Sequence, residues 1–227
     1  MQYFLDSADV DIIRTALECW PLDGVTTNPA ILARDLPEGQ TVAAQLDAIR
    51  SLTGSRLLFA QVTSSDTKGM IRDAIKLADF LGDNTSIKIP ATPDGFAAMK
   101  QLAADGLSIT ATAVYSTSQA LLAAKCGVDY AAPYISHLDN LSLDGPQVAA
   151  DMAEELRFHG LTQTQILAAS FRTAAQVERC IHSGVTAVTV TADMLTTLAT
   201  HGGTAKECAN FDAKWNVRFG KGIAEMI

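Results

Sequence analysis

Lys88 is the residue whose type and surroundings point most directly to covalent chemistry. It stands between Ile87 and Ile89 in a short β-rich run, so the two-residue period of a strand sends the lysine to one face and both isoleucines to the other. With the isoleucines facing surrounding helices, the amine is desolvated and its pKa falls. A neutral amine attacks a carbonyl carbon and forms a Schiff base. The alternative is a lysine that extends into solvent; Pro90, which ends the run, and the polar residues at other run ends favour the nucleophile.

Carbon chemistry through an iminium also needs a proton shuttle. Tyr134, together with Asp6, Gln61 and Thr112, has suitable side chains for it. A free tyrosine phenol titrates near ~10, and a cationic iminium beside it lowers the pKa, so that the group both gives and takes protons. Two plainer interpretations stay open: Tyr134 as an aromatic packing residue, and Asp6 as the cap of a helix that starts near Asp9.

Short β-rich runs alternate with amphipathic helical stretches throughout the sequence. The runs cover residues 3–5, 24–27, 57–62, 86–89, 108–114, 129–133, 165–170 and 186–190. The helices are expected at 9–19, 40–53, 66–81, 94–105, 116–126, 146–159, 173–183 and 193–201. Eight strand–helix units predict an α/β fold, a closed (β/α)8 TIM barrel, as a single domain over residues 1–227. An open doubly wound sheet is the rival, but no Gly-rich phosphate turn follows the first run.

In such a barrel the carboxyl ends of the strands form the active site. One polar residue at a strand end is ordinary, whereas seven in register indicate a common site. In chain order these residues are Asp6, Thr26 to Asn28, Gln61, Lys88, Thr112, Tyr134 and Ser170 with Arg172 just beyond.

Ser170 and Arg172 are candidates to bind a phosphate group. The loops after strands seven and eight of these barrels often bind phosphate, and a guanidinium fork matches phosphate geometry. A surface pair is the alternative interpretation, just as Asn28-Pro29 suits the start of a helix as well as a substrate site.

An extra C-terminal helix is expected within residues 205–227. Phe211, Trp215 and Phe219 recur there at i, i+4 and i+8 on one helical face. Such a helix either caps its own barrel or forms a contact between subunits.

Composition excludes several classes of protein. Hydrophobic residues make up 48% and charged residues 19% of the chain, which excludes disorder. The 17 Lys and Arg against 25 Asp and Glu give a formal net charge of −8, and without a basic run nucleic acid is not an expected partner. No apolar run approaches the roughly 18 residues of a membrane span, and Asp6 interrupts the first one. We expect a soluble protein that is not exported and has no membrane partner.

Cysteine and histidine give no metal signature. The four cysteines form no C-x-x-C pair, which excludes a zinc knuckle or redox motif and is compatible with the reducing cytoplasm. The four histidines form no H-E-x-x-H motif. The 137–146 stretch is expected to be a solvated loop rather than a metal site.

Six short motifs resemble those of the small transaldolase family, and within it those of its fructose-6-phosphate aldolase members. The resemblance covers essentially the whole chain, from Met1 to about Phe219. In aldolase members Gln61 and Tyr134 have these identities, whereas transaldolases tend to have Glu and Phe there. The motifs are Thr26-Thr-Asn-Pro29, Phe59-Ala-Gln-Val62, Ile87-Lys-Ile-Pro90, Thr112-Ala-Val-Tyr115, Ala132-Pro-Tyr134 and Leu167-Ala-Ala-Ser-Phe171.

The resemblance implies roles for these positions. Lys88 would form the Schiff base, and Tyr134 would be the acid/base group, acting through a water held by Gln61 and Thr112. Asp6 would assist proton transfer and orient donor hydroxyls. The remaining implied donor-side residues are Thr26 and Asn28. The resemblance further implies no metal or organic cofactor, and homo-oligomeric rings, pentamers or decamers, in which the C-terminal helix reaches a neighbouring subunit.

One position departs from the aldolase pattern. Aldolases of the family have a phosphate-binding arginine three residues after the tyrosine, where this chain has His137. Histidine is mostly neutral at pH 7 and lacks the bidentate fork. Arg172 and Ser170 remain, so the sequence leaves two interpretations open: a weaker phosphate site, or a different or unphosphorylated acceptor aldehyde.

The first hypothesis is therefore a class I aldolase that splits a ketose or ketose phosphate, such as fructose 6-phosphate, into dihydroxyacetone and an aldehyde such as glyceraldehyde 3-phosphate. The alternatives are a transaldolase that transfers the dihydroxyacetone unit, and a non-catalytic barrel that binds sugar phosphates. A proton-transferring isomerase is disfavoured, because no catalytic His and Glu stand at the strand ends.

Overall fold

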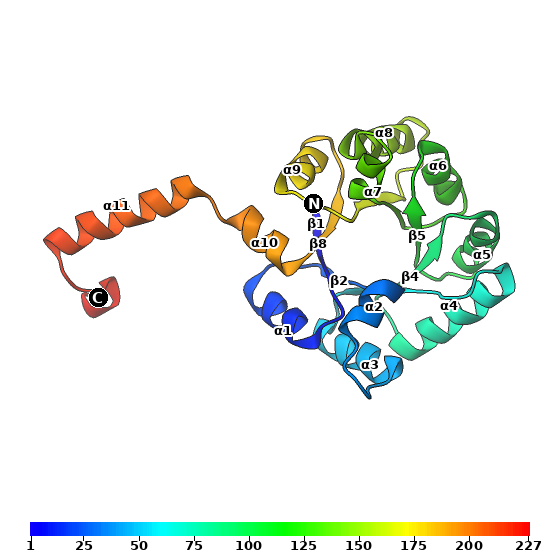
Figure 1. Cartoon of the computed structure of the whole chain (residues 1–227), viewed down its shortest axis with the longest axis horizontal. Helices are drawn as coiled ribbons and strands as arrows, with labels where there is room; N and C mark the ends of the chain where they lie inside the picture. Colours follow the sequence, from blue (N-terminus) through cyan, green and yellow to red (C-terminus); the bar gives the residue numbers. More distant parts are fainter. The chain divides into compact units, whose positions relative to one another are not determined.

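Eight parallel strands form a closed barrel in sequential order, β1 to β8 (Figure 1). The computed structural model describes all of residues 1–227, as one compact unit of residues 1–192 and a second of residues 193–227. The predicted (β/α)8 barrel with an added C-terminal helix is thus confirmed. The strands are β1 (Gln2–Asp6), β2 (Gly24–Thr26), β3 (Leu57–Gln61), β4 (Thr85–Pro90), β5 (Ile109–Val114), β6 (Tyr130–Pro133), β7 (Gln165–Ala168) and β8 (Ala187–Val190).

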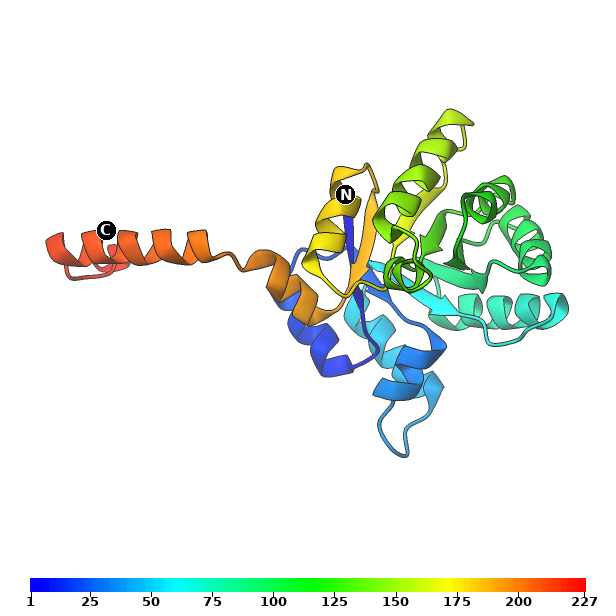
Figure 2. The same ribbon diagram turned by 45° about the horizontal axis from the view of Figure 1, so that its top comes forward.

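The helices of the first unit lie outside the ring of strands, as a second view shows (Figure 2). Most begin at a Ser, Thr or Asp whose side chain accepts a hydrogen bond from the first turn, for example Asp66, Ser116 and Thr173. They are α1 (Val10–Cys19), α2 (Pro29–Asp35), α3 (Val42–Thr53), α4 (Thr67–Leu81), α5 (Pro93–Ala104), α6 (Thr117–Lys125), α7 (Ile135–Asn140), α8 (Gly145–Phe158) and α9 (Ala174–His182).

Two short helices, α2 and α7, were not among the predicted ones. The expectation of a solvated loop over 137–146 is wrong for residues 137–140, which belong to α7 and include the fully buried Leu138, and for residues 145–146, which begin α8 and are buried. Helices of six or seven residues span fewer than two turns, which is too short to show a periodic apolar face.

An aromatic cluster fills the amino-terminal part of the barrel interior. Phe4, Phe59 and Tyr130 meet edge to face, with ring centroids 4.9 to 6.3 Å apart, and the Tyr130 hydroxyl donates to Gln2 Oε1 at 2.9 Å. Ala132, Leu167 and Ala187 complete this cluster. The interior is therefore a packed core at this end.

The second unit contains helix α10 (Ala192–Ala199) from its second residue on, helix α11 (Gly202–Arg218) and a short 3-10 turn (Ile223–Glu225). Trp215 of α11 contacts Phe219, the residue that follows the helix, with ring centroids 4.6 Å apart and ring planes tilted by 44°, and the Trp215 indole donates to the Lys221 carbonyl at 2.7 Å. The helix starts three residues before the predicted 205. None of the helices of the chain combines the length and the apolar character that a membrane crossing requires.

Candidate active site

Lys88 is buried in the barrel, as strand alternation predicts. Its side chain comes from β4 and is 5% exposed, and its Nζ donates a hydrogen bond to the Thr27 carbonyl at 2.9 Å. Burial lowers the pKa of Lys88, while the negative charge of Asp6 acts in the opposite direction. The neutral, nucleophilic form of the amine is therefore more favoured inside the barrel than it would be in water.

Asp6 lies close enough to Lys88 for their charges to interact, and it does not cap a helix. Asp9 caps α1 instead, which rules out the capping alternative for Asp6. The Asp6 carboxylate accepts a hydrogen bond from Thr26 Oγ1 at 2.7 Å. Burial raises the pKa of Asp6, against the lowering effects of Lys88 and Thr26. The two buried groups therefore shift toward their neutral forms together.

Thr189 belongs to the same network, although the sequence analysis named no residue of the eighth run. Its hydroxyl hydrogen bonds with that of Thr26. It stands between Val188 and Val190, so strand alternation was the signal that would have found it.

Gln61 is the partner of Lys88 in the β3–β4 register. Adjacent residues in register project to the same face of a sheet, which places the carboxamide beside the amine. The Gln61 Oε1 atom is buried and has no hydrogen-bond partner within the protein. A buried amide oxygen without a partner is costly, and a substrate hydroxyl or a water would satisfy it.

A backbone irregularity in β5 positions Tyr134. The register to β6 shifts between Ala111 and Val114, and Ala113 has a positive φ of 54°. The Thr112 hydroxyl then lies 2.8 Å from the Tyr134 hydroxyl. Burial raises the pKa of Tyr134, while the hydrogen bonds from Thr112 and the Ala113 backbone act to lower it.

His137 and Tyr115 lie against Tyr134. The His137 ring meets the Tyr134 ring edge to face at 5.3 Å, and His137 Nδ1 is 3.1 Å from the Tyr115 hydroxyl. Tyr115 also contacts the Tyr134 ring, at 6.2 Å. Tyr115 was not singled out from the sequence, because only the fold brings the loop after β5 next to α7.

Ser170 and Arg172 do not act as an isolated surface pair. The Ser170 hydroxyl lies 2.8 Å from that of Ser136, and Ser170 has a positive φ of 60°. Arg172 is exposed, and its guanidinium donates to Asn140 Oδ1 at 2.9 Å. Both residues thereby approach α7, the helix that contains His137.

Asn28 has a structural role as the N-cap of α2. Its Oδ1 accepts a hydrogen bond from the Ile31 N–H at 2.9 Å and caps α2. The carboxamide NH₂ is left as the group that Asn28 offers to a ligand.

The arrangement joins a buried amine with a partly buried carboxylate and a partly buried phenol at the carboxyl end of one barrel. The nucleophile and the acid/base candidate come from β4 and the end of β6, and the carboxylate links them electrostatically, since Asp6 influences the pKa of both Lys88 and Tyr134. These are the groups that covalent attack on a carbonyl and proton transfer require. The chain has no group of three His, Cys, Asp or Glu side chains placed to hold a metal ion.

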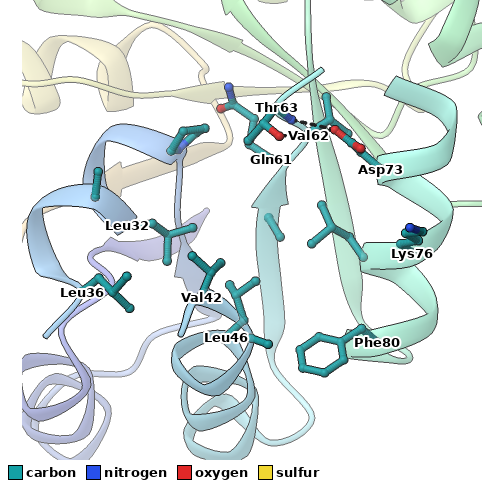
Figure 3. A pocket seen from close by; sticks show the side chains of 15 residues that line it. Leu32, Leu36, Val42, Leu46, Gln61, Val62, Thr63, Asp73, Lys76 and Phe80 are labelled. Atoms are coloured by element: carbon teal, nitrogen blue, oxygen red, sulfur yellow. Dashed lines mark hydrogen bonds between the residues drawn. The ribbon is translucent and has the colours of Figure 1, made fainter. Parts of the chain in front are cut away.

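A separate apolar hollow of about 700 Å³ lies behind β3, between α2 and α3 on one side and α4 on the other (Figure 3). Leu32, Leu36, Val42 and Phe80 line it. Gln61 lies at its edge, but Lys88 and Tyr134 do not line it. The hollow is therefore distinct from the cluster of polar residues.

Comparison with known proteins adds three findings. Residues 3–225 match the family model described as Transaldolase/Fructose-6-phosphate aldolase. A probable fructose-6-phosphate aldolase of Streptococcus pneumoniae is 37% identical over 96% of this chain and 97% of its own length. A probable transaldolase of Desulforapulum autotrophicum is 34% identical over 97% of this chain and 100% of its own length.

Solved structures show likeness in fold. A mutant flavocytochrome b2 with benzoylformate superposes with a TM-score of 0.60 over 84% of this chain. The identity is 14%, and the match covers 56% of the flavocytochrome chain. The likeness concerns the barrel alone.

Proposed function

This chain belongs to the transaldolase and fructose-6-phosphate aldolase family, and on that premise we propose that it is a class I aldolase that cleaves a ketose or ketose phosphate into dihydroxyacetone and an aldehyde. The observation that carries the proposal is the burial of the Lys88 amine within the electrostatic influence of Asp6. Burial favours the neutral amine before the reaction, and the carboxylate stabilises the iminium cation that replaces it.

The reaction begins with attack of Lys88 Nζ on the ketone carbon of the sugar; the Tyr134 phenol gives its proton to the departing hydroxyl, and loss of water leaves the iminium cation and a phenolate. The phenolate then takes the proton of the hydroxyl on the second carbon from the iminium carbon, and the bond between that carbon and the carbon next to the iminium carbon breaks. The electron pair moves into the iminium to form an enamine, and the aldehyde leaves. Protonation of the enamine and addition of water release dihydroxyacetone and restore Lys88.

The neighbouring polar groups have supporting roles in this proposal. Thr112 orients the Tyr134 phenol through their 2.8 Å contact. Gln61 holds the water that relays the proton, which would also satisfy its unpartnered oxygen. The donor hydroxyls are bound by Asp6, Thr26 and Asn28, and the acceptor side by Ser170, Arg172 and His137. No metal or organic cofactor takes part in these steps.

Reductive trapping tests the proposal. The protein is incubated with dihydroxyacetone, reduced with borohydride, digested and examined by mass spectrometry. We expect a donor-sized adduct on Lys88 that is absent in Lys88→Ala and present in Lys76→Ala, an exposed-lysine control. If dihydroxyacetone, fructose and fructose 6-phosphate all leave Lys88 unmodified, the chain is not a Schiff-base aldolase.

Transaldolase activity is the second candidate, because a probable transaldolase is among the relatives. Glutamine cannot act as a carboxylate base. We therefore predict that Gln61→Glu raises transfer of the dihydroxyacetone unit to an aldose phosphate about tenfold relative to its release. Gln163→Glu, on an exposed loop, is the matched control. The assignment of Gln61 is wrong if the Gln61 variant loses aldolase turnover and gains no transfer.

We also propose that the protein acts as a cytoplasmic homo-oligomer, a pentamer or decamer. The four cysteines are free, which suits a reducing compartment. Phe211, Trp215 and Phe219 give α11 an apolar face of the kind that subunit contacts use. Light scattering on the purified chain tests the assembly, and a mass of a single chain would contradict it.

A further inference from the structure

Tyr115 and His137 together form one wall beside the candidate acid/base residue. Both rings contact the ring of Tyr134, at 6.2 and 5.3 Å, and they contact each other through the Tyr115 hydroxyl and His137 Nδ1 at 3.1 Å. The phenol of Tyr134 itself is directed to Thr112, at 2.8 Å. The Tyr115 and His137 rings therefore flank the ring of the residue whose hydroxyl is the candidate acid/base group.

Contacts from helix α6 and from the loop after β4 hold Tyr115 in place. The Tyr115 N–H donates to Gln119 Oε1 at 2.8 Å, and Gln119 Nε2 donates to the Ala91 carbonyl at 3.0 Å. His137 is held through α7, where the Ser136 N–H donates to the Ser170 carbonyl at 2.8 Å. The wall is thus built before any ligand arrives, which lowers the cost of ordering it on binding.

The wall offers a phenol and an imidazole as hydrogen-bonding groups. The Tyr115 phenol both donates and accepts, and the His137 ring has a second nitrogen beyond the one that contacts Tyr115, but neither residue has the planar fork of N–H donors that an arginine has. The neighbouring cation, Arg172, is exposed and already donates to Asn140 at 2.9 Å. Phosphate recognition in proteins relies on charge-assisted, often bidentate contacts, and this wall does not supply them.

We infer that Tyr115 is a specificity-determining residue that, together with His137, selects an uncharged hydroxyaldehyde over a phosphorylated one as the acceptor. The inference rests on the proposed function, in which Tyr134 protonates the oxygen of the acceptor aldehyde. The rest of the acceptor then extends past Tyr134 toward the Tyr115 hydroxyl and the His137 ring, which bind its hydroxyl groups.

A pair of three-carbon aldehydes tests the role of Tyr115, with dihydroxyacetone as donor. We expect Tyr115→Phe to lower kcat/KM for glyceraldehyde about five- to tenfold, the effect of one lost hydrogen bond, and to change that for propanal, which has no hydroxyl group, less than about twofold. Tyr3→Phe is the control for loss of a phenol hydroxyl, because Tyr3 lies near the amino-terminal end of β1, whereas Asp6 of the site lies at its carboxyl end. Equal losses with both aldehydes would mean that Tyr115 is structural, and would overturn the inference.

Charge selectivity is tested with glyceraldehyde 3-phosphate. We expect the wild-type protein to have a higher kcat/KM for glyceraldehyde than for its phosphate, and His137→Arg to raise the value for the phosphate about tenfold. A wild-type preference for the phosphate overturns the inference. The trapping of Lys88 separates the two levels: selectivity that fails while the Lys88 adduct forms rejects only the acceptor assignment, whereas a missing adduct rejects the proposed function.

Discussion

At the amino-terminal end of the barrel interior, Phe4 and Phe59 pack against Tyr130, and we call this aromatic cluster the lower layer. Two residues further along β1 and β3, the same strands present Asp6 and Gln61, which belong to the upper layer. The two layers are built by the same strands, because residues i and i+2 of a strand share one face. The aromatic lower layer is mainly apolar, and the Tyr130 hydroxyl within it has a partner. The upper layer holds titratable groups that are buried or partly buried.

The upper layer also contains features that oppose stability. Gln61 Oε1 is buried without a partner, and the backbone has positive φ at Ala113 and Ser170, a conformation that favours glycine. The two layers of a single strand therefore differ in role. The lower layer stabilises the fold, whereas the upper layer is less favourable for stability because it holds reactive groups.

The largest effect is expected in the lower layer. Phe59 is fully buried between Phe4 and Tyr130, so Phe59→Ala should reduce the free energy of unfolding by about 3–5 kcal/mol through loss of contacts and the cavity that remains. Urea unfolding measures it. Phe158→Ala, at a site 79% exposed, should change it by less than about 0.5 kcal/mol. Equal decreases in the free energy of unfolding for both variants would contradict the role of the lower layer in stability.

The next largest effect is expected when one phenol hydroxyl is removed from the upper layer, and removal of one from the lower layer should have a different effect. Tyr134→Phe should lower kcat about 10²-fold, equivalent to about 2.7 kcal/mol, because the acid/base group is removed while the ring stays in contact with Tyr115 and His137.

The matched variant Tyr130→Phe removes a buried hydroxyl from the lower layer. It should reduce the free energy of unfolding by about 1 kcal/mol, through loss of the bond to Gln2, and leave kcat unchanged. Cleavage rates and urea midpoints on both proteins provide the comparison. A Tyr134 variant with unaltered kcat would remove the phenol from the mechanism.

The smallest effect concerns pH. Because burial lowers the pKa of Lys88, the unfolded chain binds the proton of this amine more strongly than the folded protein does. Folded stability attributable to Lys88 therefore rises as the pH increases from its folded pKa to the ordinary value near ~10.4, and is constant above it.

Lys88→Met should abolish this rise. We expect the unfolding free energy of the wild type relative to that of the variant to increase across that window. Lys68→Met, at an exposed position, sets the baseline for the exchange. Difference curves of the same shape for the two variants would show that Lys88 is not desolvated.

Much of this protein follows from local sequence pattern. Eight β-rich runs separated by capped amphipathic stretches predict the barrel, because hydrogen bonding and burial of one face are decided within each element. The same two-residue alternation predicts the burial of Lys88 between Ile87 and Ile89, which the structure confirms. It also holds for Thr189, whose place in the network was not predicted.

Only the tertiary structure decided which residues meet. The Lys88 contact with Thr27 spans 61 residues, that of Thr26 with Thr189 spans 163, and Tyr115 reaches His137 across 22. The hollow behind β3 likewise takes its walls from three helices. A strand's alternation fixes the face on which a side chain lies, but its partner depends on register, on the β5 bulge and on how loops pack, and these are set by contacts between elements far apart in the chain.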